Sequence, residues 1–217
     1  MATTSARRIT NICVFCGSSP GKDNEFLNLA KEVGKVLAER KIHLVYGGGD
    51  LGLMGAVSKA ANEGGSQVLG IIPKTLADSN LIGKSNGEEL IVSGMSSRLI
   101  EMINHSDAFI ALPGRLGTIE EIFTVASWAH LNIHRKPIGL LNANHVFNLL
   151  LVFLDDQKPL GLLSTEARDI ILCADNINDL IDQLQAYVPI INPILSKLDW
   201  SDSGSSKRPR IDLDLNL

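Results

Sequence analysis

The segment from Ser106 to Glu121, SDAFIALPGRLGTIEE, decides the fold. Its first half, Ala108 to Leu112, is a short continuous apolar run, which is typical of a strand buried on both faces of a parallel sheet. Pro113, Gly114 and Gly117 interrupt that run. The segment therefore predicts a buried strand that ends in a sharp turn at the edge of a sheet.

A helix is predicted directly after this turn. Thr118 and Glu121 have the spacing T-x-x-E, a capping-box pattern in which the two side chains satisfy amides of the first helical turn. We therefore expect the helix to begin near Thr118, with its free N–H groups and positive dipole end facing the carboxyl edge of the sheet. That arrangement predicts a binding site for an anion such as phosphate.

Apolar strand patterns and helical patterns alternate along the rest of the chain. Strands are predicted at 11–15, 42–46, 67–72, 108–112 and 137–141, and helices at 24–39, 53–62, 118–131, 146–154 and 177–187. Repeated βα units predict an α/β fold, a doubly wound, Rossmann-like and mostly parallel sheet with helices on both faces. Ligands of such sheets bind outside the carboxyl ends of the strands.

Composition limits the function classes. The chain has 217 residues, 45% of them hydrophobic and 20% charged, which suits one globular core. A net charge of -4 predicts no general attraction to nucleic acid or to an anionic membrane. No 18-residue apolar stretch and no apolar signal region are found, so we expect a protein of the cytoplasm and the nucleus.

The three cysteines are Cys13, Cys16 and Cys173, an odd number that suggests a reducing compartment. Cys13 and Cys16 form a C-x-x-C pair, but the first lies inside an apolar strand pattern. Core packing is favoured over redox chemistry or zinc binding, because no second Cys/His pair would complete a metal site. No metal is predicted.

We predict a flexible N-terminus over 1–8, one domain over 9–195 and a disordered tail over 196–217, because the tail is polar, rich in Ser and has little to bury. Two short patterns occur in this tail. A basic cluster of the nuclear-import type comprises Lys207, Arg208 and Arg210, and an L-x-L-x-L pattern comprises Leu213, Leu215 and Leu217. The second pattern resembles the plant EAR repression motif, whose extended alternating leucines would suit a groove on a corepressor. A solvated tail with a chance match is the alternative.

Two further glycine-containing loops follow predicted strands. GGGDLGLMG, from Gly47 to Gly55, contains five glycines within nine residues and lacks the Gly-Lys-Ser/Thr of a Walker A loop. Its glycines would let the backbone approach a ligand closely. A tight structural turn is the alternative, and the density of glycines makes it the weaker one. The C-G-S-S turn from Cys16 to Ser19 offers hydroxyl groups that could bond a phosphate or a ribose.

These elements together resemble the LONELY GUY family, the cytokinin riboside 5′-monophosphate phosphoribohydrolases. C-G-S-S, G-G-G-x-x-G-L-M-G, S-D-A-F-I-A-L-P-G and W-A-x-L-x-I-H occur in order over about Ile9 to Pro189. The resemblance implies hydrolysis of the N-glycosidic bond of a cytokinin nucleoside monophosphate, releasing free base and ribose 5-phosphate without a cofactor. It also implies a site between subunits, hence a homodimer or a larger homo-oligomer.

The resemblance assigns catalysis to Glu121, as the carboxylate near C1′, and to Arg98, as an electrostatic and orienting group. Two simpler interpretations are that Glu121 only caps its helix and that Arg98 is an exposed helix cation. Substrate binding is assigned to the residues of the loops and their surroundings: Gly17, Ser18, Ser19, Gly47, Gly48, Gly49, Gly52, Met54, Lys84, Met95, Arg98, Leu99, Pro113, Gly114, Arg115, Leu116, Gly117, Thr118 and Glu120.

The chain departs from the family pattern at several positions. Arg115 stands where the second of two paired glycines is expected, Leu99 where a Lys follows the Arg, and Lys84 about where a Glu is expected; Ser96 and Ser97 also differ. A Cβ at position 115 would be strained if φ were positive. The Arg115 side chain could bind phosphate or could fill the pocket. The alternative function is therefore a weak or inactive nucleotide-binding protein that acts through its EAR-like tail.

Overall fold

The structure is a computed structural model that describes residues 8–22, 24–79, 81–193, 195–198 and 200. The basic cluster at 207–210 and the leucine pattern at 213–217 lie outside the described residues, as do the first seven residues of the predicted flexible N-terminus. None of the described helices is long and apolar enough to cross a membrane.

Seven strands form one sheet in the order β4-β3-β2-β1-β5-β6-β7, and every neighbouring pair is parallel. The strands are β1 (Asn11–Phe15), β2 (His43–Tyr46), β3 (Val68–Pro73), β4 (Glu88–Val92), β5 (Ala108–Ala111), β6 (Ile138–Leu141) and β7 (Ile171–Ala174). The chain builds outward from β1 to β4 and then returns to pair β5 with the free side of β1. This order confirms the predicted doubly wound fold, and it places the switch in strand order between β1 and β5.

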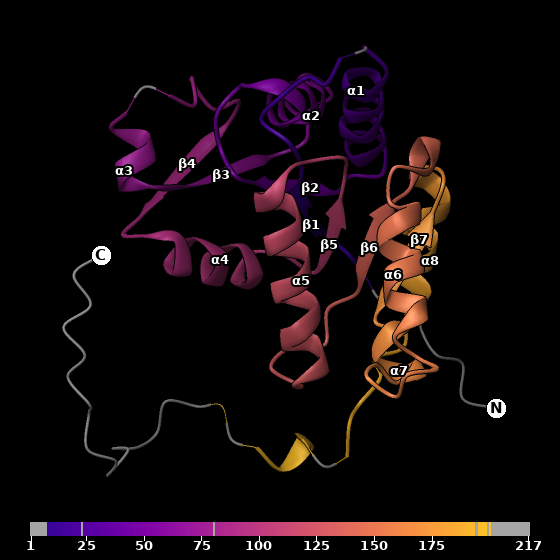
Figure 1. Ribbon diagram of the computed structural model, residues 1–217. Coiled ribbons are helices and arrows are strands. Elements are labelled where there is room, and N and C mark those ends of the chain that lie inside the picture. Colours follow the sequence, from indigo (N-terminus) through magenta and orange to yellow (C-terminus); the bar gives the residue numbers. More distant parts are fainter. Residues whose placement is uncertain (1–7, 23, 80, 194, 199, 201–217) are drawn as a thin grey trace, which may run out of the picture.

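Helices cover both faces of the sheet (Figure 1). They are α1 (Asn24–Glu39), α2 (Gly52–Glu63), α3 (Lys74–Ala77), α4 (Met95–Asn104), α5 (Leu116–His130), α6 (Asn148–Asp156), α7 (Thr165–Arg168) and α8 (Ile177–Ala186), with short 3-10 turns η1 (Ala143–His145) and η2 (Leu195–Lys197). Apolar residues of α1, α2 and α8 pack on one face, and those of α4, α5 and α6 pack on the other.

Strand residues feed these two layers alternately. Ile12 and Val14 of β1 belong to the layer under α1, α2 and α8, whereas Cys13 and Phe15 belong to the opposite layer. Successive side chains of a strand point to opposite faces, so a strand in the middle of the sheet must be apolar throughout. The single core predicted from composition is therefore divided into two layers by the sheet. Burial also raises the pKa of the Cys13 and Cys16 thiols, which makes both unreactive packing residues.

The sequence analysis assigned no element to β4, α4 or β7. Strand β4 forms the edge of the sheet, and none of its five residues is fully buried, so it lacks the continuous apolar run that marks the central strands. Helix α4 does carry a helical pattern, because Leu99, Met102 and Ile103 are its buried residues. This interval contains the arginine of the predicted catalytic pair, and its structure decides where that arginine lies.

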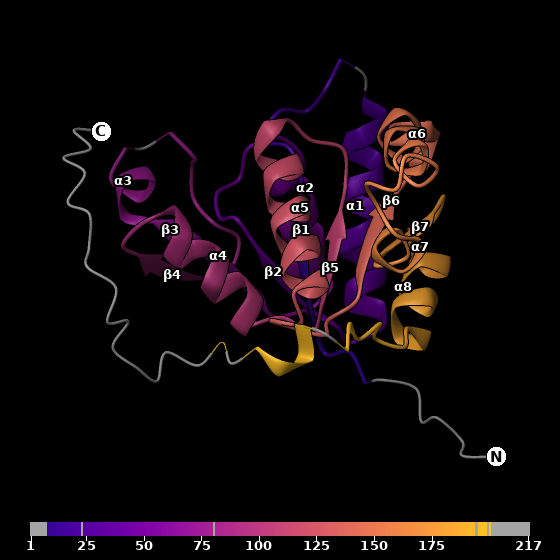
Figure 2. The same cartoon turned by 60° about the horizontal axis from the view of Figure 1, so that its bottom comes forward.

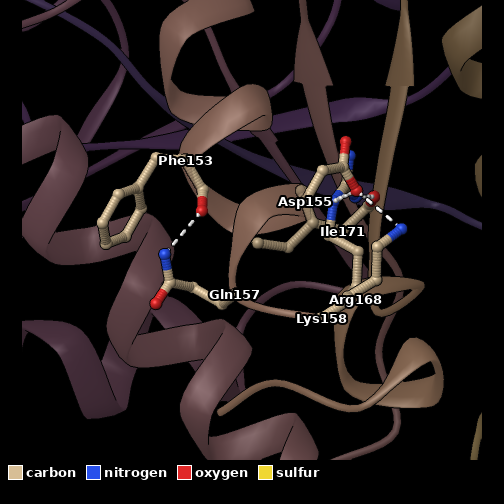
Figure 3. Close-up of polar contacts among 6 residues, drawn as sticks. All are labelled: Phe153, Asp155, Gln157, Lys158, Arg168 and Ile171. Atoms are coloured by element: carbon tan, nitrogen blue, oxygen red, sulfur yellow. Dashed lines mark hydrogen bonds and ion pairs between the residues drawn. The ribbon is translucent and has the colours of Figure 1, made fainter. Parts of the chain in front are cut away.

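Polar contacts join the end of α6 to α7 and β7 (Figure 3). The carboxylate of Asp155 accepts a hydrogen bond from Arg168 Nε at 3.2 Å and lies 2.8 Å from Lys158 Nζ. Arg168 Nη1 also donates to the carbonyl oxygen of Ile171 at 3.2 Å. These bonds hold the outer helices against the edge of the sheet opposite β4.

Helices α1 and α2 pack closely because small residues line their contact. A Cβ added to Gly34 of α1 would lie 2.4 Å from the carbonyl oxygen of Val57 and 2.8 Å from the Cβ of Ala60. The obstacle is the backbone of α2, which cannot rotate away as a side chain could. The absence of a side chain at position 34 therefore sets the distance between these two helices.

We expect Gly34→Ala to lower the free energy of unfolding by about 1–3 kcal/mol, the usual cost of overpacking a core. Alanine favours a helix by about 1 kcal/mol over glycine, so any net loss measures the collision with α2. Urea denaturation followed by circular dichroism measures the change. Gly94→Ala is the control, since a Cβ there meets nothing within 4 Å; equal losses in the two variants would contradict this account of the contact.

Candidate active site

Three loops meet at the carboxyl edge of the sheet, beside the switch in strand order. They follow β1 (17–19), β2 (47–49) and β5 (113–115). Backbone hydrogen bonds connect them directly: Gly17 N donates to the carbonyl oxygen of Pro113, and Leu53 N donates to that of Gly17, both at 3.0 Å. The sequence predicted this meeting of loops, because the carboxyl ends of parallel strands share one edge.

The helix after the β5 loop begins earlier than predicted, and the capping box does not form. Helix α5 starts at Leu116, Arg115 occupies its N-cap position, and no side chain caps it. Thr118 is buried, and its Oγ1 would lie 2.0 Å from a Cβ added to Gly114. Thr118 therefore packs beneath the turn, and Gly114 is glycine because that contact leaves no room for a side chain.

Glu121 contacts Arg98 instead of the helix amides. Arg98 Nη2 lies 3.1 Å from Glu121 Oε1, and the two side chains are only 12% and 10% exposed. Arg98 Nε also donates to the carbonyl oxygen of Ile71 at 3.2 Å, and a Cβ added to Gly47 would lie 2.2 Å from Arg98 Nη2. The guanidinium is thus held between β3, the glycine loop and α5, so neither of the simpler interpretations of these two residues applies.

Burial raises the pKa of Glu121 to about 7. The Arg98 guanidinium beside it lowers that pKa, and the neighbouring carboxylate of Glu120 raises it. Burial outweighs the attraction of the cation because the carboxylate has lost most of its water. Near neutral pH both the ionised and the protonated forms of Glu121 are populated, which is the property required of a general acid or base.

The pair lies in the wall of a cavity of about 660 Å³ between α4 and α5, which lie side by side on one face of the sheet (Figure 2). The cavity is lined by Met95, Ser96, Arg98, Leu99, Ile100, Met102, Leu116, Gly117, Glu120, Glu121, Thr124 and Trp128. This volume is within the range that small-molecule sites usually have, about 300–1,000 Å³. The cavity combines one ion pair with mostly apolar walls, so it suits an organic ligand with a large apolar part.

The predicted site residues fall into three groups. Those in the cavity wall are Met95, Arg98, Leu99, Leu116, Gly117, Glu120 and Glu121. Those in or against the three loops are Gly17, Ser18, Ser19, Gly47, Gly48, Gly49, Gly52, Met54, Pro113, Gly114, Arg115 and Thr118. Lys84 is exposed on the loop before β4, whose Ser85 Oγ accepts a hydrogen bond from Gly49 N at 2.9 Å.

The departures from the family pattern fit into this geometry. Arg115 has φ -98° and ψ -158°, an extended conformation that any residue adopts, so its Cβ causes no backbone strain. Its side chain is exposed and is not part of the wall of the cavity between α4 and α5. Leu99 is 9% exposed and packs in the core layer under α4 and α5 while forming part of the cavity wall. Arg98 consequently has an apolar neighbour instead of a second cation.

Sequence reasoning did not assign Ser96, Ile100, Met102, Thr124 or Trp128 to the site, although all five line the cavity. The sequence contains a signal for two of them. Thr124 and Trp128 continue from Glu120 at intervals of four residues, and residues four apart lie on one face of a helix. Ser96 and Ile100 of α4 have the same spacing, but they were missed because no helix was predicted in this interval.

Known proteins resemble this chain closely. A family model described as "Possible lysine decarboxylase" matches residues 54–184. The cytokinin riboside 5′-monophosphate phosphoribohydrolase LOG7 of Arabidopsis thaliana is 49% identical over 195 residues, which is 90% of each chain. LOG4 of the same plant is 47% identical over 91% of this chain and 92% of its own. A rice protein named as a probable member, LOGL3, is 48% identical over 89% and 92%.

Solved structures of lower identity share the fold. The molybdenum cofactor carrier protein of Chlamydomonas reinhardtii superposes with a TM-score of 0.61 at 19% identity, covering 83% of this chain and 100% of its own. The molybdenum cofactor binding protein of Rippkaea orientalis gives 0.61 at 18% identity, covering 83% and 98%. At such identities the likeness concerns the fold alone. The sequence relatives, matched over nine-tenths of their length, and the family model show that the chain belongs to the LONELY GUY family.

Proposed function

We propose that this protein is a phosphoribohydrolase that splits the N-glycosidic bond of cytokinin nucleoside 5′-monophosphates into free cytokinin base and ribose 5-phosphate. The observation that carries the proposal is the buried pair of Arg98 and Glu121 in the wall of a largely apolar cavity. Arg98 of this pair also lies against Gly47 of the glycine loop. The chain is about half identical to relatives named for this activity.

The chemistry follows from the charges that develop in the reaction. Cleavage of the bond between C1′ and N9 leaves positive charge on the sugar, as in glycoside hydrolysis, and a nearby carboxylate stabilises it. The ionised carboxylate of Glu121 supplies that charge and orients or deprotonates the attacking water. Water gives its hydroxyl to C1′, and the departing base gains a proton.

Arg98 acts by its charge and position. Its guanidinium hardly donates a proton at neutral pH, but its five N–H donors allow it to bind an anion or the base while it keeps Glu121 in place. By lowering the pKa of Glu121, it also increases the fraction of the reactive carboxylate at a given pH.

The apolar residues of the cavity provide a place for the N6 substituent of a cytokinin. Ile100, Leu116 and Trp128 lie in the same cavity wall as the ion pair. Transfer of an isoprenoid side chain from water to such a surface is favourable, whereas transfer of the bare amino group of adenine is not. The geometry therefore supports a preference for N6-substituted bases.

We also propose that the protein is a homodimer or a larger homo-oligomer of the cytoplasm and the nucleus. Side chains at the cavity are exposed: Leu116 by 87%, Met95 by 55% and Ile100 by 45%. Neighbouring large apolar side chains exposed to water are typical of surfaces that a partner covers. A second copy of the chain over this surface would also exclude water from the reacting atoms.

We expect Glu121→Gln to lower kcat by about 10²–10⁴-fold, the usual contribution of a positioned acid or base. In the parent protein, kcat/KM for isopentenyladenosine 5′-monophosphate should fall below pH about 7, because protonation removes the reactive carboxylate. Release of free base, measured by chromatography between pH 5 and 9, tests both results. A rate unchanged by the substitution would contradict the role of Glu121.

The fall of kcat/KM at low pH is the acidic limb of the pH profile. Two neighbours of Glu121 should shift this acidic limb in opposite directions. Arg98→Leu removes the cation that lowers the pKa, so the limb should move to higher pH as the rate falls. Glu120→Gln removes the carboxylate that raises the pKa, so the limb should move to lower pH. The pH profiles of the two variants form a matched pair, and a limb that stays in place in both would mean that another group titrates.

We expect isopentenyladenosine monophosphate to exceed adenosine monophosphate in kcat/KM by at least about tenfold, the discrimination that an apolar pocket gives even to small apolar groups. Trp128→Ala should reduce this ratio by removing one wall of the cavity. Leu149→Ala is the control, since Leu149 is an apolar residue of α6, 86% exposed and outside the cavity wall. An equal ratio in all three proteins would argue against an apolar subsite.

Sedimentation equilibrium of the full chain should give a mass of at least twice the chain mass of 23.4 kDa. Ile100→Glu places a charge in the exposed surface at the cavity and should favour the monomer. Val152→Glu is the control, because Val152 is an exposed apolar residue of α6 outside the cavity wall. Dimers that persist in the first variant and dissociate in the second would place the contact on α6 instead.

A further inference from the structure

Tyr46 is a fully buried phenol that the proposed mechanism does not use. It is the last residue of β2 and is 0% exposed. Its hydroxyl donates a hydrogen bond to the carbonyl oxygen of Gly49 at 3.0 Å and accepts one from Asn86 N at 3.3 Å. Buried polar groups are usually satisfied, but here both partners belong to loops. The hydroxyl therefore connects the loop after β2 to the loop before β4.

A second hydroxyl holds the same glycine. Ser85 Oγ accepts a hydrogen bond from Gly49 N at 2.9 Å, so side-chain oxygens bond both the N–H and the carbonyl group of Gly49. Asn86 in turn donates from Nδ2 to Oγ of the buried Ser58 in α2, at 3.0 Å. The loop is thus fixed at Gly49 by side chains that come from three different parts of the fold.

The glycine loop, Gly47 to Gly49, requires such support because its backbone is unusually free. The φ angles of Gly48 and Gly49 are +81° and +78°, in the left-handed region. Glycine adopts this region readily, and it loses more conformational freedom on folding than any other residue. Three consecutive glycines therefore have many alternative conformations, and the bonds from Tyr46 and Ser85 select one of them.

The selected conformation places the loop directly against Arg98. A Cβ added to Gly47 would lie 2.2 Å from Arg98 Nη2, the same nitrogen that lies 3.1 Å from Glu121 Oε1. The backbone at Gly47 and the carboxylate of Glu121 are thus neighbours of one nitrogen. A loop that moved toward the guanidinium would collide with it, and a loop that moved away would leave it free to turn from Glu121.

We propose that Tyr46 is a positioning residue, whose hydroxyl fixes the glycine loop so that the loop keeps the Arg98 guanidinium against Glu121. The inference rests on the proposed function, because it concerns the pair that would cleave the N-glycosidic bond. Tyr46 is not part of the cavity wall, so it acts only through this loop. Removal of the hydroxyl should therefore change the charge environment of Glu121 and leave the apolar walls of the cavity as they are.

Four groups interact electrostatically with Glu121. Arg98 of α4 lowers its pKa, and Glu120 of α5 raises it. The thiols of Cys13 and Cys16 are also near, but burial raises the pKa of both, which leaves them uncharged at neutral pH. Arg98 is the cation of this set, so its displacement should raise the pKa of Glu121.

Tyr46→Phe keeps the ring and removes the hydroxyl. We expect the acidic limb of kcat/KM for isopentenyladenosine 5′-monophosphate to move to higher pH. We also expect kcat to fall about tenfold, which corresponds to the loss of one hydrogen bond. KM should change by less than about threefold, the pattern of an interaction that matters in the transition state.

Ser66→Ala is the matched control. Its hydroxyl is also buried and donates to a backbone carbonyl, that of Ile42 at 2.7 Å. Ile42 and Ser66 precede β2 and β3, so this bond lies at the opposite edge of the sheet from the site. The control should lower stability while its acidic limb stays where the limb of the parent protein is.

Ser85 tests the same loop independently, should Tyr46→Phe fail to fold. Ser85→Ala removes the acceptor for Gly49 N and should move the acidic limb in the same direction as Tyr46→Phe. Ser85→Thr keeps a hydroxyl at this position and should recover most of the rate that Ser85→Ala loses.

The pKa of Glu121 is also measured without turnover, by carbon NMR of its carboxyl group in each full-length protein. We expect a higher pKa in Tyr46→Phe and in Ser85→Ala than in the parent, and the value of the parent in Ser66→Ala. A pKa equal to that of the parent in both loop variants, or an equal rise in Ser66→Ala, would overturn the inference.

The two proposals fail in different ways. If the parent protein releases no base while Tyr46→Phe raises the pKa of Glu121, the proposed function is wrong and the positioning role stands. If base release is lost in Glu121→Gln while Tyr46→Phe keeps the kcat and the acidic limb of the parent, the proposed function stands and the role of Tyr46 is wrong.

Discussion

A parallel sheet in water must have both faces covered by other elements, and this requirement determines where functional side chains can lie in this chain. The central strands are buried, so their side chains build the two core layers and take no part in binding. Only the strand ends and the first turns of the following helices reach solvent. The loops after β1, β2 and β5 therefore carry the polar and glycine residues of the site.

The switch in strand order separates the halves of the site and brings their ends together. Strand β1 pairs with β2 on one side and with β5 on the other, so the loops that follow these three strands become neighbours. Helix α4 follows β4 and brings Arg98 to the carbonyl group of Ile71. Helix α5 follows β5, on the other side of the switch, and brings Glu121 to the same arginine.

Burial of the Glu121 carboxylate has a cost in stability. Its pKa in the folded protein, about 7, lies above the ordinary value of 4.5. The folded state therefore holds this proton more tightly than the unfolded chain does. The resulting stabilisation is present below pH 4.5 and is lost as the pH rises toward 7. Such a cost is common where a site requires a poorly solvated group.

Much of the fold and part of the site were predictable from the amino-acid sequence. Central strands, their helices and the glycine loops have strong local signals, because their burial, periodicity and turns depend on neighbouring residues. The edge strand β4 was missed because it is half exposed, and the start of α5 was misplaced because Thr118 and Glu121 match a capping box that the fold does not form. The sequence by itself thus determined the doubly wound architecture, the family and the loops at its carboxyl edge. Only the tertiary structure decided that Glu121 pairs with Arg98, that Trp128 joins the cavity and that Arg115 remains exposed. Each of these depends on the packing of α4 and α5 across the sheet, which no local pattern contains.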